Sequence, residues 1–507
     1  MSDKRPNILL FFTDQQRADT IAALGNDVIR TPAMDRLCRE GTAFTRCYTP
    51  SPVCVPARYS LATGLPPHRT RCVDNGTHPT PHPPSFMQRL AEAGYQTHGV
   101  GKMHFVPDSR MPWGFASRDT SEEMARDDDY GRFLLASGFD HVEDPSGVRS
   151  EMYYVPQPSQ LPARLHATAW VADRSIDFLQ RRDRSRPFFL WTSFTKPHPP
   201  FENPAPWYKL YRTAEMAPPF RPEGFEDLLC YWNHVQNRYK YRDHGYDEPI
   251  VRTIRAAYYA CISFVDYHLA RVLEALGPEI DDTLILFTSD HGEMLGDYGS
   301  FGKRCMLDAA AKVPLIVRWP GRMAAGQRCG GPASLQDVWR TVLRAGQADD
   351  SGPGEEDSVD LAELAGGSPG RKLVFSQFQQ RGYAVYLAAS ATRKYVYSAP
   401  DGREWLFDSA RDPKETKDLS RDADCADSLA WLRKETIRRF QRDGYGEVLE
   451  GDGWKRWPRR EIPDDPDFGL LFQDAAGLQD RIDALGPYAR KVTVPPSEAI
   501  RILKPEE

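Results

Sequence analysis

NILLFFT, residues Asn7–Thr13, is a continuous apolar run that leads directly into Asp14-Gln15. Runs this short, without polar alternation, are typical of strands buried on both faces of a parallel sheet. The pattern recurs at three later places: Pro187–Phe194 (PFFLWTSF), Thr283–Ser289 (TLILFTS) and Val313–Trp319 (VPLIVRW). We therefore predict a sheet built around these strands.

Helix signals lie between the apolar runs. Thr31-Pro32 has the pattern of an N-cap followed by proline in the first turn, and that helix should end at Gly41. Apolar residues recur at helical spacing over His166–Leu179 and over Ile254–Leu276, which is followed by Gly277. Strands that alternate with helices predict an α/β fold with a mostly parallel sheet between helices.

The composition changes after the last long run. Ala345–Asp357 is rich in glycine and acids and reads as a loop or linker. Short strand candidates and one helix follow it: Lys372–Phe378, Ala384–Ala388, Lys394–Ser398, Glu404–Phe407 and helix Ala426–Asp443. We predict a catalytic α/β domain over 1–365, a smaller C-terminal α+β domain with a short antiparallel sheet over 366–462, and an extended tail over 463–507.

Composition narrows the class of protein. The chain has 507 residues, 65 Lys+Arg and 71 Asp+Glu, for a net charge of −6. This mild acidity argues against nucleic acid as a partner. No apolar run approaches the roughly 20 residues that span a bilayer, so no membrane partner is expected. Nine cysteines are too few for a disulfide framework. We expect a cytoplasmic protein.

Two predicted strands end in acids, at Asp14-Gln15 and at Asp290-His291. Ligands bind beyond the carboxyl ends of the strands in an open parallel sheet. Two carboxylates brought together there would repel each other unless a cation lay between them. His291 adds a nitrogen donor and Gln15 an amide oxygen. The alternative is that each aspartate only caps the next helix.

Cys54-Val55-Pro56-Ala57-Arg58 is predicted to open a helix that ends at Gly64. Cys54 would then lie at a helix N-terminus, where the free N–H groups favour an anion. Arg58 lies one turn further along the same face. From spacing alone, Cys54 is either a reactive thiolate or a buried structural cysteine.

These residues resemble the sulfatase family of the alkaline-phosphatase-like superfamily, whose signature is C-x-P-x-R. Further segments resemble the family in the same order along the chain: Asp14 after the first strand, Gly101-Lys102-Met103-His104, Lys196–Phe201, Ser289–Glu293, Gly302-Lys303, and Trp405–Asp408 with Asp412–Glu415. The resemblance covers residues 6–420 and implies the alkaline-phosphatase-like fold.

The resemblance also implies a chemistry, the hydrolysis of a small-molecule sulfate ester. In this family a separate formylglycine-generating enzyme oxidises the signature cysteine, here Cys54, to Cα-formylglycine. One hydroxyl of the hydrated aldehyde attacks sulfur, and the second is then deprotonated to release the product. The implied roles are as follows: Arg58 holds the modified residue, Lys102 and Lys303 neutralise the ester oxygens, His104 acts on the diol, His198 is the general acid, and Asp14, Gln15, residue 54, Asp290 and His291 bind one divalent metal ion.

Two departures from the common sulfatase pattern widen the range of activities. Asp14-Gln15 and Asp290-His291 replace the usual Asp-Asp and Asp-Asn pairs, as in bacterial phosphonate monoester hydrolases, choline sulfatases and related arylsulfatases. The histidine makes Mn²⁺ plausible beside Ca²⁺. Asn75 lies where that subgroup places a substrate-contacting asparagine. A phosphonate monoester or phosphodiester hydrolase remains the first alternative. The second, a non-catalytic binding protein, is disfavoured by the complete signature.

Other segments carry weaker signals. The charge runs Glu122–Asp129 and Gln180–Arg186 are predicted to be solvated helix faces or ends. Residues 203–246 are rich in aromatics and form either an insertion that packs on itself or a wall of the substrate pocket. Trp454–Arg460 mixes bases and aromatics and is expected in surface packing or a subunit contact. The apolar residues of the tail either cover the same chain or a neighbouring subunit of a homodimer or homotetramer.

Overall fold

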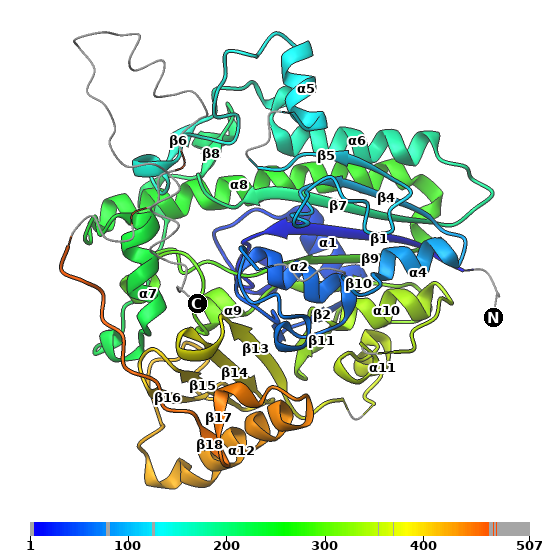
Figure 1. Ribbon diagram of the computed structural model, residues 1–507. Coiled ribbons are helices and arrows are strands. Elements are labelled where there is room, and N and C mark those ends of the chain that lie inside the picture. Colours follow the sequence, from blue (N-terminus) through cyan, green and yellow to red (C-terminus); the bar gives the residue numbers. More distant parts are fainter. Residues whose placement is uncertain are drawn as a thin grey trace, which may run out of the picture.

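A computed structural model describes residues 5–77, 82–123, 127–352, 354–368, 370–465, 470 and 473. Eight strands form its large sheet, in the order β11-β2-β10-β9-β1-β7-β4-β5. Their bounds in that order are Gln327–Cys329, Thr42–Phe44, Leu315–Arg318, Thr283–Ser289, Asn7–Asp14, Phe188–Pro197, Gln96–Gly101 and Ser117–Thr120. The predicted central strands are therefore confirmed, and Figure 1 shows them side by side in the middle of the molecule.

The direction of one strand differs from the simplest prediction. β1 pairs in parallel with β7 and β9, and β4 in parallel with β7 and β5. β10, by contrast, runs antiparallel to β9, with Leu315 opposite Thr288. No long helix crosses over between these two strands. The chain from Asp290 to Pro314 contains turns, the 3₁₀ helix Asp297–Gly299 and the short helix α9 (Asp308–Ala311). The chain can thus return beside β9 in the opposite direction, and the sheet is mixed but mostly parallel.

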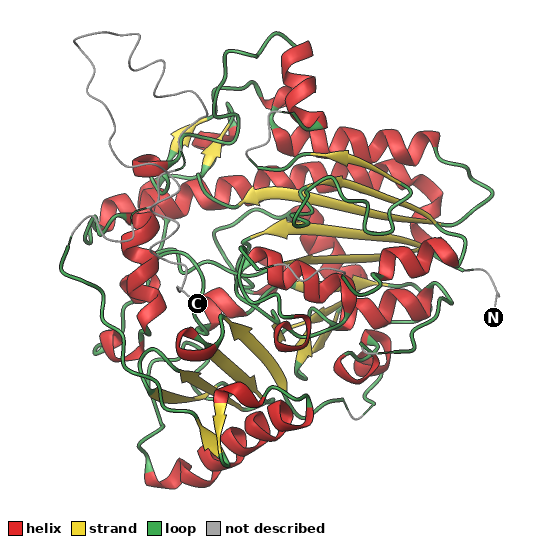
Figure 2. Cartoon of the chain, viewed as in Figure 1, coloured by secondary structure: helices red, strands yellow, loops and turns green. Residues whose placement is uncertain are grey.

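Helices cover both faces of the large sheet (Figures 1 and 2). Leu9 and Phe11 of β1 pack in one apolar core with three helices: α1 (Pro32–Glu40), α6 (Ala167–Arg181) and α8 (Glu248–Leu276). Ile8, Leu10 and Phe12 point to the other core, with α2 (Cys54–Thr63), α4 (Phe86–Glu92), α10 (Asp337–Ala345) and α11 (Leu361–Ala365). Burial of β1 on both faces explains its unbroken apolar run.

Helix α1 begins where the sequence predicts, but a different residue caps it. Thr31 occupies the N-cap position without capping the helix through its side chain. Instead, the carboxylate of Asp266 on α8 accepts hydrogen bonds from the N–H groups of Ala33 and Met34, at 3.0 and 2.8 Å. A tertiary contact thus supplies the acceptor that the first turn needs.

A second, antiparallel sheet follows in the order β13-β14-β15-β16. Its strands are Val374–Phe378, Val385–Ala389, Arg393–Ser398 and Arg403–Asp408, close to their predicted positions. One face packs on helix α12 (Ala426–Arg442) through residues such as Tyr386 and Phe440. The other face packs on segments of the large-sheet region that include Val53 and Met306. The small sheet therefore supports the two segments that lead to Cys54 and away from Lys303.

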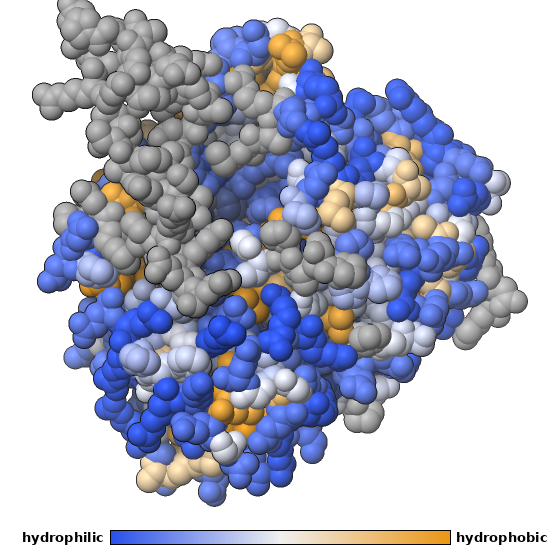
Figure 3. Space-filling model, in the orientation of Figure 1, coloured by the Kyte–Doolittle hydropathy of each residue, from blue (hydrophilic) through white to orange (hydrophobic). Residues whose placement is uncertain are grey.

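The remaining α-helices and strands are short. They are α3 (Pro67–Thr70), α5 (Asp129–Ala136), α7 (Tyr231–Gln236) and strands β3 (Cys47–Tyr48), β6 (Gln157–Pro158), β8 (Glu202–Asn203), β12 (Ala333–Ser334), β17 (Leu449–Glu450) and β18 (Gly453–Trp454). None of the helices in the described part of the chain combines the length and apolar character needed to cross a bilayer. The face seen in Figure 3 is mostly hydrophilic, with scattered apolar residues. The predicted role of the tail over 463–507 falls almost entirely outside the described residues.

A buried ion cluster joins the two sheets. The Lys394 ammonium group on β15 donates to the Met306 carbonyl and to Asp308 Oδ1, both at 2.8 Å, and pairs with Glu415. Glu415 also accepts a hydrogen bond of 2.7 Å from the N–H of Asp308, at the start of α9. Lys394 is fully buried. The cluster fixes the chain three residues after Lys303.

Replacing Lys394 with methionine should therefore leave the buried Glu415 without its cation and Asp308 with only its 3.7 Å pair to Lys312. We expect the free energy of unfolding to fall by about 3 kcal/mol, the usual cost of breaking a buried ion pair from one side. Urea denaturation followed by circular dichroism measures the change. Lys417→Met, which removes an exposed charge, is the control. Equal midpoints for the two variants would refute a stabilising role for the cluster.

Candidate active site

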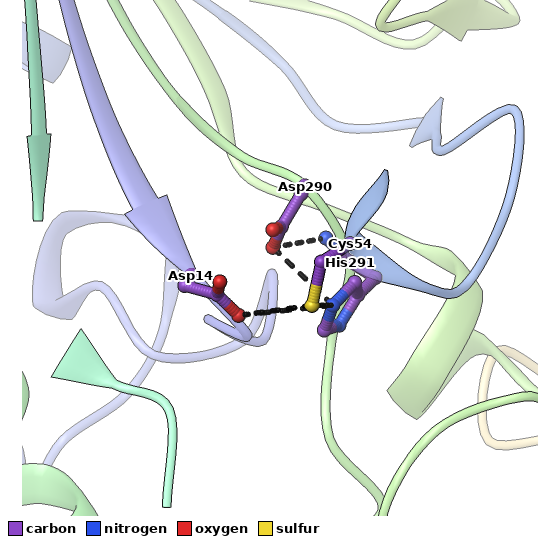
Figure 4. A group of neighbouring side chains, drawn as sticks. All are labelled: Asp14, Cys54, Asp290 and His291. Atoms are coloured by element: carbon purple, nitrogen blue, oxygen red, sulfur yellow. Dashed lines mark hydrogen bonds and ion pairs between the residues drawn. The ribbon is translucent and has the colours of Figure 1, made fainter. Parts of the chain in front are cut away.

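Four potential metal ligands meet beyond the carboxyl end of the large sheet (Figure 4). Asp14 is the last residue of β1, Asp290 and His291 follow β9, and Cys54 is the first residue of α2. One ligand atom from each residue lies within 4.8 Å of the others, and all four residues are buried. The two strand-end segments and the cysteine helix thus come together as the sequence predicts.

Helix α2 holds Cys54 rigidly because all ten of its residues are buried. It ends at Gly64, whose φ of 73° is in the left-handed region that glycine adopts readily. The N-cap residue, Val53, makes no capping bond through its side chain. Asn75 Oδ1 takes that role and accepts a hydrogen bond of 3.0 Å from the N–H of Val55. Asn75 therefore lies next to Cys54 and anchors the start of the helix.

The two carboxylates divide their oxygens between two tasks. Asp14 Oδ2 pairs with Lys102 at 2.7 Å and with Arg58 at 3.2 Å, and Asp290 Oδ2 pairs with Arg58 at 2.9 Å. Asp14 Oδ1 instead faces the thiol, 3.6 Å from Cys54 Sγ. Asp290 Oδ1 lies 3.5 Å from His291 Nε2. One oxygen of each carboxylate thus faces the centre of the cluster while the other is neutralised from behind.

Hydrogen bonds also orient the neutral donors. His291 Nδ1 lies 3.0 Å from the Gly292 carbonyl, so this nitrogen carries the proton and Nε2 presents its lone pair to the cluster. Cys54 Sγ is 3.2 Å from that Nε2. The amide of Gln15 is fixed at both ends, because Nε2 donates to Glu293 and Oε1 accepts from Lys303 at 2.7 Å. An imidazole nitrogen and an amide oxygen are therefore available as further ligands.

The electrostatics of the cluster favour a cation. Burial raises the pKa of Asp290, and the nearby Asp14 carboxylate raises it further. Burial also opposes ionisation of Asp14, but Lys102, His198, Arg58 and Lys303 together hold its pKa well below the usual range. A second ionised carboxylate beside Asp14 needs added positive charge. The donor set, two carboxylates with histidine, amide and sulfur or its oxidised replacement, fits a divalent cation such as Mn²⁺ or Ca²⁺.

The Cys54 thiol is electrostatically activated. Lys303 Nζ donates to Cys54 Sγ at 3.0 Å and lies 3.1 Å from His291 Nε2. Burial and the Asp14 charge raise the pKa of Cys54, but Lys303, His291 and Lys102 outweigh them and hold it well below its usual value. Of the two open interpretations, the structure thus favours a functional cysteine over a purely structural one.

Acidic and basic side chains that the sequence interpretation missed surround His198. Glu123 Oε1 lies 2.6 Å from His198 Nδ1, and Glu123 Oε2 lies 2.9 Å from Lys102 Nζ. Arg149 pairs with the same carboxylate. The prediction that Glu122–Asp129 is a solvated run is therefore wrong for Glu122 and Glu123, whose side chains are only 10% and 13% exposed, and for Asp128, which is buried. No local pattern marks Glu123, because its partners come from three distant segments.

Among the described residues, no contact joins the His104 side chain to the network of Glu123, Lys102 and His198. Its backbone N–H bonds to the Glu122 carboxylate, and its φ of 55° turns the chain sharply. Its ring Nδ1 is buried without a hydrogen-bond partner in the described part of the chain. Buried imidazole nitrogens normally have a hydrogen-bond partner, so this atom is an exception among the described residues.

The aromatic segment 203–246 was predicted either to pack on itself or to form a wall of the substrate pocket, and its residues differ in this respect. Trp232 packs on Phe378 of the small sheet, with ring centroids 4.8 Å apart, and Tyr241 stacks on Phe301 at 3.8 Å. These contacts are internal packing. Tyr239 instead faces Arg304, whose guanidinium carbon lies 5.7 Å from the ring centroid, beside Lys303. The end of the segment therefore approaches the site.

Comparison with known proteins places this geometry in a class. The fold matches the phosphonate monoester hydrolase of Agrobacterium radiobacter with a TM-score of 0.76 and 26% identity, over 90% of this chain and 100% of that one. The chain is also 28% identical to an arylsulfatase of Clostridium perfringens (87% and 96% covered), and 30% identical to a choline-sulfatase of Rhizobium meliloti (83% and 83% covered). Fold and donor cluster define an alkaline-phosphatase-like hydrolase.

The family follows from a more specific match. The sulfatase family model aligns with residues 6–348, more than half of the chain. The chain therefore belongs to the sulfatase family and is a sulfuric ester hydrolase. This confirms the resemblance inferred from the Cys54–Arg58 signature and the ordered motifs around it.

Proposed function

We propose that this sulfatase acts through Cα-formylglycine formed from Cys54, and that it hydrolyses the sulfate monoester of a small molecule. The observation that carries the proposal is the position of Cys54 Sγ, which lies within 3.6 Å of Asp14, His291 and Lys303 at the start of a buried helix. A separate generating enzyme would supply the oxidant that replaces the C–S bond of residue 54 by an aldehyde C=O. The hydrated aldehyde then offers two hydroxyl groups at the centre of the cluster.

Asp14, Gln15, Asp290, His291 and residue 54 would hold one divalent metal ion, Ca²⁺ or Mn²⁺. When bound, that ion would supply Lewis acidity and lower the pKa of a hydroxyl group beside it. The chain itself contributes the orientation of the donors. Arg58 bridges the outer oxygens of Asp14 and Asp290 at 3.2 and 2.9 Å and so fixes the angle between the carboxylates.

Lys102 and Lys303 would bind the ester oxygens and stabilise the charge that develops on them during transfer. Lys303 suits this role because its described contacts are with Gln15, Cys54 and His291 and include no carboxylate. Lys102 shares its charge with Asp14 and Glu123. His104, whose buried Nδ1 has no hydrogen-bond partner among the described residues, would take the proton of the second hydroxyl as the covalent sulfate ester collapses to the aldehyde.

His198 would protonate the leaving group. Burial lowers its pKa to about 3, although the Glu123 carboxylate opposes this shift. The ring is therefore neutral at pH 7 before substrate binds. The negative charge of a bound ester would raise the pKa of the ring, and Glu123 at Nδ1 would stabilise the imidazolium so formed. In this proposal Glu123 is a positioning residue that keeps Nε2 directed toward the substrate.

The alternative substrate is a phosphonate monoester or a phosphodiester. It is supported by the structural similarity to a phosphonate monoester hydrolase. Both kinds of ester carry one negative charge at neutral pH, so Lys102 and Lys303 cannot separate them by charge. The family match and the arylsulfatase and choline-sulfatase relatives favour the sulfate ester.

A paired assay distinguishes the two. Protein made together with a formylglycine-generating enzyme is tested on 4-nitrophenyl sulfate and on the 4-nitrophenyl ester of phenylphosphonic acid, which share a leaving group. We expect kcat/KM to be at least about tenfold higher for the sulfate, a difference of about 1.4 kcal/mol in transition-state stabilisation. A preference of the same size for the phosphonate would reverse the assignment.

A further inference from the structure

Lys240 is a basic residue beside the site that forms no ion pair with the described residues. It lies in the π-helical segment Asn237–Tyr241. Its ammonium group donates to the Tyr153 hydroxyl at 2.6 Å and lies 4.4 Å from the centre of the same ring. A buried or half-buried ammonium group is costly unless an anion accompanies it. Such a group is therefore a candidate for binding an anion from outside the chain.

Tyr153 connects Lys240 to the reaction centre. Its side chain is 1% exposed, and its ring meets the His198 ring edge to face, with centroids 6.3 Å apart. Arg149, which pairs with Glu123, lies 5.6 Å from the centre of the Tyr153 ring. Lys240 is thus one aromatic side chain away from the histidine proposed to protonate the leaving group.

Arg304 is a second cation with unused donors at the same place. It follows Lys303 in the chain, and its guanidinium lies over Tyr239, the residue before Lys240. Its ion pair within the described part of the chain is long, 3.8 Å from Nη2 to Asp74 Oδ1. Its Nη1 is buried and has no hydrogen-bond partner among the described residues. Lys240 and Arg304 are therefore two basic side chains near Lys303 whose hydrogen-bond donors the described residues do not fully use.

The basic groups near Lys240 oppose its protonation. Burial lowers the pKa of Lys240 well below its usual value, the charges of Lys303 and Arg304 lower it further, and the Glu123 carboxylate partly opposes these effects. An anion bound between Lys240 and Arg304 would relieve this repulsion. In the proposed mechanism, Lys102, Lys303 and a metal ion held by the donor cluster would already match the single charge of a sulfate monoester, so that charge does not account for Lys240 and Arg304.

We propose that Lys240 and Arg304 bind a second anionic group of the substrate, a carboxylate or a further sulfate on the part that leaves with the ester oxygen. The inference rests on the proposed sulfate ester hydrolysis and adds a substrate class to it, sulfate esters of acidic alcohols or phenols. Lys240 reaches the leaving group past Tyr153 and His198, while Arg304 reaches it from beside Lys303. Both act as specificity-determining residues.

The test uses matched aryl sulfates in the full-length, formylglycine-containing enzyme. The substrates are a series of nitrophenyl sulfates, each with one carboxymethyl group at a different free ring position. Each acid is compared with its methyl ester, which lacks the carboxylate charge. We expect the native enzyme to prefer at least one acid over its ester by about tenfold or more in kcat/KM, the scale of one charge-assisted hydrogen bond. Lys240→Met and Arg304→Met should each remove most of that preference by raising KM for the acid.

Matched variants separate charge recognition from general damage. Lys240→Arg retains the charge and should retain most of the preference. Lys434→Met, which removes an exposed charge on α12, should have no effect. Hydrolysis of the neutral esters by the native enzyme establishes the proposed function independently. The inference is overturned if the native enzyme prefers none of the acids, or if Lys240→Met lowers kcat/KM equally for acid and ester. Failure to hydrolyse any aryl sulfate would overturn the proposed function as well.

Discussion

Cys54→Ser is expected to abolish sulfate ester hydrolysis, with kcat lowered by about three orders of magnitude or more. Serine fits the buried start of α2, but it lacks the thiol that the generating enzyme oxidises, so no aldehyde hydrate forms at the centre of the cluster. Loss of the nucleophile in enzymes that use covalent catalysis has effects of this size or larger. Initial rates with 4-nitrophenyl sulfate provide the measurement.

The matched control is Cys425→Ser, which changes a buried cysteine at the small sheet. It should reduce the rate by less than about threefold, since this residue lies in the core beneath α12. Circular dichroism and the thermal midpoint establish that both variants are folded. A Cys54→Ser protein with near-native kcat would show that the reaction does not pass through a modified residue 54.

Asp290→Ala is the second change with a large expected effect, the loss of both metal and activity. The substitution removes Oδ1, which faces the cluster, and Oδ2, which orients Arg58 at 2.9 Å. Substitutions of residues behind metal ligands commonly weaken metal binding 10- to 100-fold, so loss of a direct ligand should weaken it by at least about 100-fold. Metal content after gel filtration, determined by mass spectrometry of the elements, and the rate of hydrolysis are measured together.

Asp266→Asn is the control for this experiment. Asp266 is also a buried aspartate, but it caps α1 from helix α8 and lies outside the cluster. Asparagine preserves an acceptor oxygen at that position, so metal content should stay at the native level. Native metal content in folded Asp290→Ala protein would mean that the ion binds elsewhere.

The central sheet could be predicted because burial leaves a direct record in the sequence. Strands β1 and β9 are covered on both faces, and each is therefore an unbroken apolar run. The direction of β10 could not be predicted in this way. The apolar run Val313–Trp319 is compatible with a parallel or an antiparallel strand, and the antiparallel pairing depends on the path of the chain from Asp290 to Pro314.

Parts of the site were predictable for a related reason. Asp14 ends β1 and Asp290 follows β9. These two strands pair directly, with Thr13 opposite Ser289, so the proximity of the two carboxylates is a consequence of sheet geometry. The cap on α2 was not predictable, because Asn75 reaches Val55 from a loop about 20 residues away in sequence. The substrate contact expected for Asn75 stays a prediction.

The contacts of Glu123 and Lys240 could not be predicted from the sequence. Both lie in segments without apolar periodicity, and both acquire their roles through contacts with residues distant in the chain: Glu123 with Lys102 and His198, and Lys240 with Tyr153. A charged residue in a polar run is usually solvated. The structure is needed to identify a charged residue of such a run that makes buried contacts instead.

The state of residue 54 tests the central claim most directly. Trypsin releases Cys47–Arg58, a peptide that contains both Cys47 and Cys54. In protein made with the generating enzyme and alkylated after denaturation, we predict a peptide about 18 Da lighter than the unmodified sequence before alkylation, the difference between cysteine and formylglycine. That peptide should carry one alkyl label, on Cys47. A fully active protein whose peptide carries two labels and shows no loss of mass would contradict the account.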